Sequence, residues 1–299
     1  MRFTSFPSRR AAIGLTLALS VASLVAPPTA SVLAHTSDVS HASRLVSIGS
    51  SVTEIIYALG LEERLVARDS TSMYPEAVTQ LPDVGYMRQL SPEGVLSVDP
   101  DAILAVEGSG PPGTIEVLKK ASVPFIAIPE SFDRAGILAK IEHIGAALGE
   151  AGKAGELAAR VDAELADAET ATAGITERKR VLFVLSMQGG KILASGQGTA
   201  ADGMILLAGG VNAVTGFHGY KQLTDEAVIG AAPDLVLMMD RGGPGVAEDP
   251  FASAALAATP AGQDKSLVRM DGLYLLGFGP RTATAVRDLS RALYGDAAK

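Results

Sequence analysis

The chain has 299 residues, with 25 Lys and Arg against 33 Asp and Glu, so its formal net charge at pH 7 is −8. This acidic balance argues against nucleic acid or an anionic membrane surface as a partner, because both repel a negatively charged protein. The chain contains no cysteine, which excludes disulfides, thiol chemistry and a lipid anchor on an N-terminal cysteine.

Residues 1–34 have the pattern of an export signal. Three arginines precede an apolar run over residues 13–25, and small residues follow at Val32-Leu33-Ala34. The run is shorter than the ~20 residues of a membrane span, and the paired arginines leave the Sec and twin-arginine export routes both open. We expect cleavage near Ala34 and a periplasmic mature chain with 22 basic and 33 acidic residues, a net charge of −11.

Residues 35–43 are expected to form a flexible N-terminal tail, and residues 44–132 an N-terminal α/β lobe. Continuously apolar runs alternate there with helical patterns, which indicates a parallel sheet covered on both faces. The expected strands are residues 45–48, 65–67, 102–106 and 125–128. The expected helices cover about residues 52–59, 92–97 and 114–121.

Residues 133–173 form a helical connector in this interpretation. Apolar residues recur at helical spacing up to Gly149, and a second amphipathic pattern runs over residues 151–172. A helix of about 22 residues would be ~33 Å long, enough to pass from one lobe to another.

Residues 174–299 are expected to form a C-terminal α/β lobe on the same plan, with a hairpin at Gly189-Gly190. The expected strands are residues 181–186, 192–194, 235–239 and 267–270. The expected helices are residues 200–207 and 282–294.

A long internal repeat supports two similar lobes. The segment at residues 83–106 recurs at residues 216–239, and from Leu90 and Leu223 onward the two copies keep a constant offset without a gap. A repeat this far apart indicates two related lobes with a cleft between them.

Tyr86 heads the first copy and Tyr220 the second, in loops that we expect to face the cleft. Phenolate is a hard anionic ligand suited to ferric iron, and tyrosinate is one of the ways in which proteins hold haem iron. The free phenol has a pKa near 10, so a neighbouring cation is needed to stabilise the anion. Arg88 is the nearest candidate cation, and His218 is a further candidate for contact with a ligand.

Two motifs with enzymatic associations are weak here. Residues 196–201 match the dinucleotide fingerprint G-x-G-x-x-A, but no acidic strand end follows about 20 residues later, so we interpret them as a tight turn. Ser50-Ser51 follows a strand as a nucleophile elbow does, but the G-x-S-x-G frame and a convincing histidine base are missing. We therefore expect no enzyme.

Four segments resemble the periplasmic haem-binding proteins of haem ABC importers, the hemin-binding protein T family. They are DSTSMYP at 69–75, GYMRQLSPEG at 85–94, GQGTAADGM at 196–204 and GFGPRT at 277–282. The resemblance extends over essentially the whole mature chain. It implies a class III periplasmic binding protein, an α/β fold of two Rossmann-like lobes joined by a single long α-helix, with haem held in the cleft between the lobes.

The resemblance also implies roles for single residues. Tyr86 takes the place of the axial iron ligand, and Arg241 that of an arginine near the tyrosinate or the haem carboxylates. Some relatives supply a second axial ligand from a histidine before the GQGTAAD segment, where this chain has Ser186-Met187-Gln188. We expect five-coordinate iron, with His218 and Met187 left open as sixth ligands.

The remaining expected haem contacts come from both lobes. Arg68, Arg88 and Arg241 are the cations available to the propionates, and Met87 and Tyr220 complete the set.

Glu93 and Glu226 occupy equivalent places in the repeat. The resemblance implies that one surface glutamate in each lobe docks onto arginines of the permease. Both residues also suit a helix N-terminus, where the dipole favours an acidic side chain.

The sequence thus predicts a monomeric, non-enzymatic haem carrier. It would capture haem as its transported ligand, downstream of an outer-membrane haem receptor, and deliver it to an inner-membrane ABC permease with its ATPase. A cobalamin or ferric-siderophore carrier of the same fold is the alternative, and a periplasmic enzyme with a Rossmann-like lobe is the third.

Overall fold

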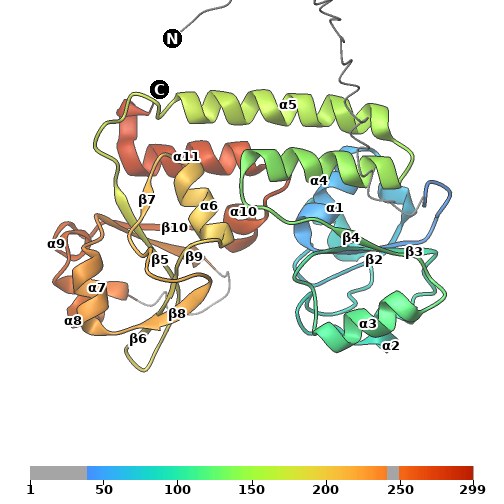
Figure 1. Cartoon of the computed structure of the whole chain (residues 1–299), viewed down its shortest axis with the longest axis horizontal. Coiled ribbons are helices and arrows are strands. Elements are labelled where there is room, and N and C mark those ends of the chain that lie inside the picture. The colour runs from blue at the N-terminus through green and yellow to red at the C-terminus, as the bar shows by residue number, and fades with distance from the viewer. Residues whose placement is uncertain (1–38, 241–248, 299) are drawn as a thin grey trace, which may run out of the picture. The chain divides into compact units, whose positions relative to one another are not determined.

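Four short apolar strands make the sheet of the first lobe (Figure 1). They are β1 (Leu45–Ile48), β2 (Leu65–Arg68), β3 (Ala102–Val106) and β4 (Phe125–Ile128), all parallel, in the order β2-β1-β3-β4. The helices are α1 (Ser50–Ala58), α2 (Pro92–Leu96), α3 (Pro112–Lys120) and α4 (Arg134–Ala147), with 3₁₀ turns at Glu62–Arg64 and Glu76–Gln80. The computed structural model describes residues 39–240 and 249–298, which all fall in one compact unit.

Both faces of this sheet are buried, as the unbroken apolar strands predict. Successive residues of β3 point to opposite sides: Leu104 and Val106 pack with α1 and α4, while Ile103 and Ala105 pack with α2 and α3. Alternation along a strand therefore supplies two cores from one short run.

The second lobe has a mixed sheet in the order β10-β9-β5-β6-β8, with β7 also paired to β5. Its strands are β5 (Arg180–Gln188), β6 (Lys191–Ser195), β7 (Val211–Asn212), β8 (Tyr220–Leu223), β9 (Leu235–Asp240) and β10 (Leu267–Asp271). Its helices are α6 (Ala200–Leu207), α7 (Asp225–Ala231), α8 (Ala254–Ala257), α9 (Pro260–Asp264), α10 (Gly272–Leu276) and α11 (Thr282–Tyr294), with 3₁₀ turns at Pro250–Ala252 and Gly295–Ala297.

The second lobe departs from the plan of the first on one side. The predicted hairpin is present, with Gly189 and Gly190 at φ 58° and 77°, and it turns β6 antiparallel to β5. β8 then pairs antiparallel with β6, so Tyr220 begins an edge strand and does not lie in a loop as predicted. This four-residue strand, YKQL, has only two apolar side chains and gives little periodic signal.

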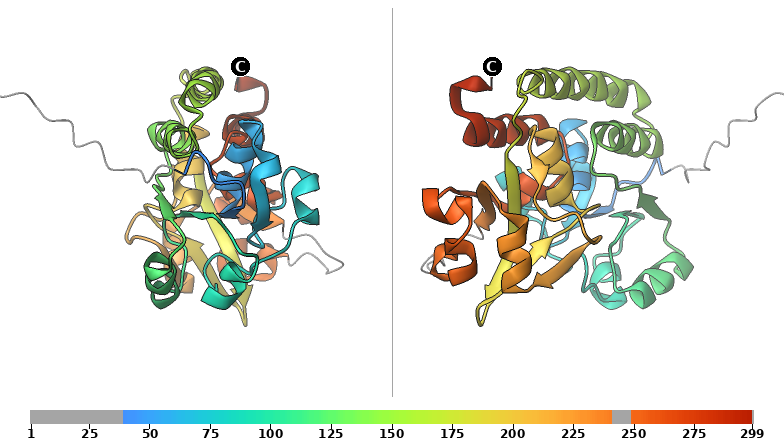
Figure 2. Two further views of the ribbon diagram at one scale, coloured as in Figure 1. Left: turned by 90° about the vertical axis from the view of Figure 1, so that its right-hand side faces the viewer. Right: turned by 60° about the vertical axis from the view of Figure 1, so that its left-hand side comes forward.

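The predicted connector forms two helices, α4, which packs on the first lobe, and α5 (Ala151–Thr170), separated by a short turn at Gly149, whose φ is 77°. Figure 2 shows α4 and α5 lying side by side. α5 has 20 residues and leads into the second lobe, while α4 packs on α1 and β4. One core unites α1 and α4 of the first lobe with α6, α11 and β5 of the second, so the two lobes share buried side chains.

The described part of the N-terminal tail is packed against the first lobe. Val39 is 4% exposed and donates its N–H to the carbonyl of Ala147. The Arg64 guanidinium donates to the carbonyl oxygens of Val39, Ala42 and Leu148. Residues 39–43 thus differ from the flexible segment that the polar sequence predicts.

The repeat corresponds to a shared frame at the amino ends of the two sheets. Asp101 accepts the N–H of Arg44, and Asp234 accepts the N–H of Arg180, at the starts of β1 and β5. Each arginine side chain donates to a carbonyl just before the Pro-Asp pair, at Val98 and at Ala231. The arginines have an offset of 136 residues and lie outside the repeat, which is why a search for sequence repeats does not find them.

The architecture is α/β with two lobes, as predicted from the alternation of strands and helices. Within residues 39–240 and 249–298, no helix combines the length and apolarity that crossing a bilayer requires.

Candidate functional site

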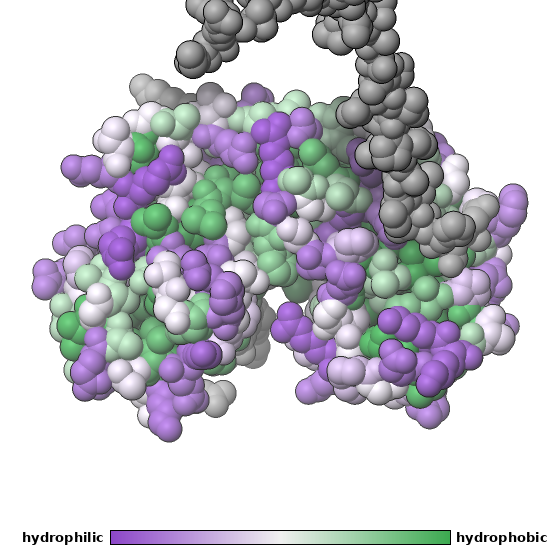
Figure 3. Space-filling model, viewed as in Figure 1, coloured by the Kyte–Doolittle hydropathy of each residue, from purple (hydrophilic) through white to green (hydrophobic). Residues whose placement is uncertain are grey.

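A cavity of about 630 Å³ opens between the two lobes and is lined by residues of both. Figure 3 shows the surface hollowed at this place. Its walls follow the carboxyl ends of parallel strands: Gly49 after β1, Glu107 after β3, Glu130 after β4, and Asp240 and Asp271 at the ends of β9 and β10. Ligands of α/β proteins bind at this edge of the sheet, and a volume of about 300–1,000 Å³ is usual for them.

The Tyr86 loop forms part of the first-lobe wall. Tyr86, Met87 and Arg88 all line the cavity. Tyr86 is 41% exposed, and the carbonyl of the preceding Gly85, at φ 102°, accepts the N–H of Ser70. The loop therefore presents a phenol, a thioether and a guanidinium to the same space.

Tyr220 lines the same cavity from the second lobe. Its ring packs edge-to-face on Phe183, with centroids 6.5 Å apart. Burial raises the pKa of Tyr220, while a hydrogen bond with Thr199 and the positive charge of Arg88 oppose the rise. Arg88 therefore acts electrostatically across the cavity, and the structure brings the two predicted tyrosine positions to one site.

Carboxylates outnumber cations on the described walls. Glu107, Glu130, Asp240 and Asp271 line the cavity, and Arg88 is the one cation among the lining residues of the described chain. An anionic ligand group is therefore best placed near Arg88, because the rest of the described wall repels it.

A buried lysine lies behind the cavity wall. Lys140 of α4 is fully buried, and its Nζ donates to Glu130 Oε1 at 2.5 Å, to Ser51 Oγ at 3.2 Å and to the carbonyl of Phe278 at 3.2 Å. Burial raises the pKa of Glu130 and lowers that of Lys140, and the attraction between the two charges opposes both shifts. The sequence gives no sign of this pair, because a lone lysine in an amphipathic helix is usually exposed.

Three predicted contacts lie elsewhere. Arg68 is buried, donates through Nη1 to Asp83 Oδ2 at 2.7 Å and does not line the cavity. Asp83 Oδ1 in turn accepts the N–H of Gly85, so this pair supports the Tyr86 loop. Met187 is packed in the core of the second lobe and His218 is exposed beside Gly198; neither lines the cavity. Arg241 lies outside the described residues.

The segment at residues 196–201 is a turn closed by its own hydrogen bonds. Gly198, at φ 70°, donates its N–H to Asp202 Oδ2, and the Thr199 side chain caps α6 by accepting the N–H of Asp202. The loop at Phe217 leaves no room for a side chain at Gly196. These contacts agree with the interpretation of the motif as a strand-to-helix turn.

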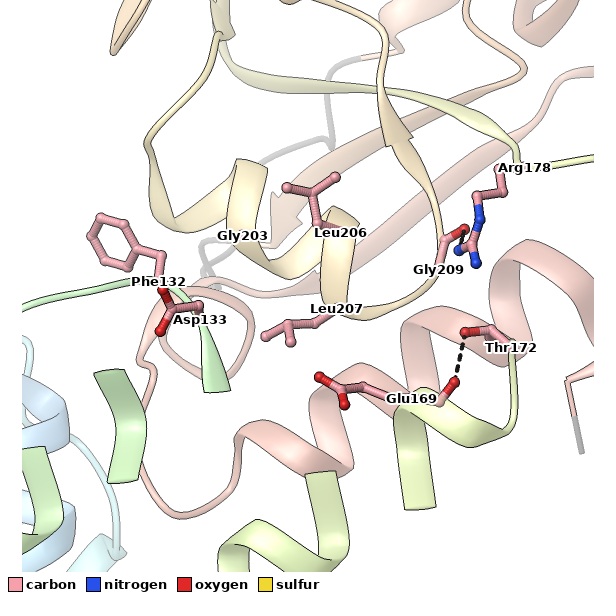
Figure 4. Close-up of a pocket in the computed structure, with 9 residues that line it drawn as sticks. All are labelled: Phe132, Asp133, Glu169, Thr172, Arg178, Gly203, Leu206, Leu207 and Gly209. Atoms are coloured by element: carbon pink, nitrogen blue, oxygen red, sulfur yellow. Dashed lines mark hydrogen bonds between the residues drawn. The ribbon is translucent and has the colours of Figure 1, made fainter. Parts of the chain in front are cut away.

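A second, smaller cavity of about 320 Å³ lies between α6 and the end of α5 (Figure 4). Leu206 and Leu207 of α6 both line it, and the Thr172 hydroxyl beside it donates to the carbonyl of Glu169. None of the residues predicted as ligand contacts lines this cavity.

Glu93 and Glu226 are both exposed, in the first turns of α2 and α7. Ser91 caps the first of these helices and Thr224 the second, each side chain accepting a backbone N–H three residues on. The pKa of Glu226 is lowered by its own backbone N–H and by Thr224.

Comparison with known proteins gives consistent matches over most of the chain. Residues 45–273 match the family model described as periplasmic binding protein. The periplasmic heme-binding protein BhuT in complex with two hemes is 42% identical, with a TM-score of 0.80 over 85% of this chain and 99% of that one. The apo form of RhuT, a periplasmic heme-binding protein from Roseiflexus sp. RS-1, is 39% identical, with a TM-score of 0.80 over 86% and 99%.

A further relative is a substrate-binding component of an ABC transporter by name. The uncharacterized ABC transporter substrate-binding lipoprotein YvrC of Bacillus subtilis (strain 168) is 27% identical over 86% of this chain and 81% of its own length. The two α/β lobes joined by α5 have the class III arrangement, and the chain belongs to the periplasmic binding protein family.

Proposed function

We propose that this protein binds haem in the cleft between its lobes and carries it to an ABC importer. The observation that carries the proposal is the exposed phenol of Tyr86 on the cavity wall, two residues from Arg88. Two structural neighbours at 39% and 42% identity are heme-binding proteins by name. The site residues suit a ferric porphyrin, since phenolate oxygen is a ligand of haem iron.

Tyr86 is the proposed axial ligand, and Met87 and Tyr220 pack against the porphyrin. Arg88 would stabilise the tyrosinate or pair with a propionate. Arg68 is assigned to support of the loop because it already pairs with Asp83. Arg241 keeps the role that the family resemblance gives it, and His218 keeps only that of a sixth ligand reached by movement of its loop.

The family supports an exported solute carrier that works with an ABC transporter. Cleavage near Ala34, a periplasmic monomer and an upstream outer-membrane haem receptor are the finer parts of the proposal. Glu93 and Glu226 are the proposed contacts with the permease. Each stands at the start of a helix that runs antiparallel to the strand after it, so both lie on the side where the strands end and the cavity opens.

The proposal is tested by titrating purified protein with ferric haem and following the absorption spectrum. We expect a high-spin tyrosinate spectrum that saturates near one haem per chain, and no spectral change would contradict haem binding. Tyr86→Phe should lose the tyrosinate signature, whereas Tyr220→Phe should keep it; the reverse result would assign the iron to Tyr220. Titration with cobalamin tests the alternative, and tighter binding of cobalamin than of haem would favour that carrier.

A further inference from the structure

The segment at residues 69–75 resembles a family motif, yet the proposed function gives it no role. Its first residue, Asp69, follows β2 and is fully buried. It does not line the cavity. A buried carboxylate is costly unless it is hydrogen-bonded, so its surroundings show what it supports.

The Asp69 carboxylate accepts four hydrogen bonds, two on each oxygen. Oδ1 accepts from the N–H of Gly49 at 3.0 Å and from Ser72 Oγ at 2.7 Å. Oδ2 accepts from the N–H of Thr71 at 3.0 Å and from Thr71 Oγ1 at 2.6 Å. Every donor comes from a turn next to the cavity.

These donors connect the carboxylate to two of the first-lobe turns on the cavity wall, and a further contact reaches a third. Gly49 begins the first turn, whose next residues, Ser50 and Ser51, line the cavity. Thr71 lies in the second turn, and its Oγ1 is 3.9 Å from Met87 Sδ in the third.

A backbone hydrogen bond connects the Asp69 turn to the Tyr86 loop. Ser70, next to Asp69, donates its N–H to the carbonyl of Gly85 at 3.0 Å, and Gly85 directly precedes Tyr86. A shift of the turn at Ser70 therefore also shifts the backbone at Gly85, which sets the direction of the Tyr86 side chain.

We infer that Asp69 is a positioning residue for the haem site: its buried carboxylate holds three wall turns in register and thereby fixes the direction of the Tyr86 phenol. The inference rests on the proposed function. Hydrogen bonds from neutral donors to an ionised acceptor are stronger than those between neutral groups, which suits a rigid hub. A hydroxyl or apolar residue there would leave buried N–H and O–H groups without an acceptor.

The chain offers a control carboxylate at the other end of the same sheet. Asp101 also accepts three hydrogen bonds, from the N–H and Oγ of Ser43 and the N–H of Arg44. It stands at the amino end of β3, away from the cavity, and lines no part of it. Asp101→Asn therefore removes the charge of a second hydrogen-bonded carboxylate, an exposed one whose three bonds all fall on Oδ2, without disturbing the wall turns.

The experiment compares wild-type protein, Asp69→Asn and Asp101→Asn by ferric haem titration, absorption spectroscopy and thermal unfolding of the apo form. Asparagine keeps the size of the side chain but turns one acceptor into a donor that faces donors. We expect Asp69→Asn to bind haem about tenfold more weakly or worse, with a changed tyrosinate band although Tyr86 is intact. Asp101→Asn should lower the unfolding temperature and leave the spectrum of the haem complex unchanged.

Ser72→Ala provides a milder second variant, because Ser72 is buried, donates to Asp69 and does not line the cavity. It should shift the same band and weaken binding by about threefold, and it decides the matter if Asp69→Asn does not fold. A wild-type spectrum in every folded variant at position 69 or 72 overturns the inference. A wild-type chain that binds no haem instead overturns the proposed function.

Discussion

At the scale of single residues, the Lys140 ammonium is a fully buried charge with a hydrogen-bond partner for each of its protons. Its three hydrogens go to Glu130, Ser51 and Phe278, so none of its donor capacity is left over. The acceptors come from α1, from the segment after β4 and from the loop before α11. One side chain therefore ties the back of the cavity to both lobes.

Replacing Lys140 by Met should destabilise the protein by about 3 kcal/mol at neutral pH, because it leaves the Glu130 carboxylate buried without its partner. Loss of the ammonium raises the pKa of Glu130 further above its ordinary value of 4.5. A raised pKa means that the folded state binds more protons, so stability falls as pH rises above about 4.5. Urea unfolding of both proteins at pH 5 and pH 8 measures this.

We expect the difference between Lys140→Met and wild type to be smaller at pH 5 than at pH 8. The double variant Lys140→Met with Glu130→Gln should recover part of the loss, since it removes the charge. An equal loss at both pH values would show that packing of the lysine stem, and not its charge, is responsible.

At the scale of elements, the short helices α2 and α7 are equivalent in the two lobes. Each is capped by a hydroxyl side chain and carries a glutamate in its first turn. Helix dipoles and caps of this kind contribute about 0.3–1 kcal/mol each. Such small local effects do not by themselves explain why both glutamates are exposed on the side where the cavity opens.

Exchanging Glu93 and Glu226 together for Ala should leave haem affinity and the spectrum unchanged and reduce ATP-dependent haem uptake by vesicles that contain the permease. The physical reason is the loss of two charge-assisted contacts at the docking surface. Glu156→Ala is the control, because Glu156 is exposed on α5, and α5 lies on the opposite side of the molecule from α2 and α7 in Figure 1. Uptake equal to that of wild type would reject the docking role.

Most elements were predictable from sequence because their apolar runs are continuous or periodic. Predicted and observed bounds agree for β1, β3, α6 and α11. The expected elements do not include β7, β8 or the helices α7 to α10: β8 is a polar edge strand, and each of these helices has seven residues or fewer. Pattern analysis is weakest for such short elements, where pairing with neighbours decides the structure.

The part of the site next to the repeated segment was predictable from sequence. Contacts between residues far apart in the sequence were not. Tyr86, Met87, Arg88 and Tyr220 line the cavity as expected. Arg68 does not, because it pairs with Asp83, a contact between a buried arginine and an exposed carboxylate that sequence spacing does not reveal. The contacts of Asp69 with neighbouring turns depend on the sheet that brings those turns together.

At the scale of the whole molecule, a second ion pair joins the lobes beside the Lys140 contacts. Arg281, at the start of α11, donates to both oxygens of Glu54 in α1, at 2.6 and 3.0 Å, and its guanidinium lies 3.7 Å from the ring centroid of Tyr74. The Glu54 side chain is 6% exposed and that of Arg281 28%. Together with the shared core, these contacts hold the two lobes in position behind the cavity.

Arg281→Gln should lower the free energy of unfolding by about 2 kcal/mol, less than the loss of a partner from a fully buried pair, because water reaches the arginine. Arg291→Gln on the same helix is the control: it removes an exposed pair with Asp288 at 3.9 Å and should change stability by no more than about 0.5 kcal/mol. Urea unfolding gives both values. Equal effects would show that Glu54 is solvated without its partner.

The frame made by Arg44 and Arg180 lies at the amino ends of the sheets, and the cavity lies at their carboxyl ends. In the frame the two lobes keep matching contacts, whereas at the cavity they present different side chains. The contacts that the two lobes share and those in which they differ thus lie at opposite ends of the same strands. The wall turns can therefore be exchanged to retarget the protein to another flat, anionic ligand, while the arginine frame continues to hold each sheet together.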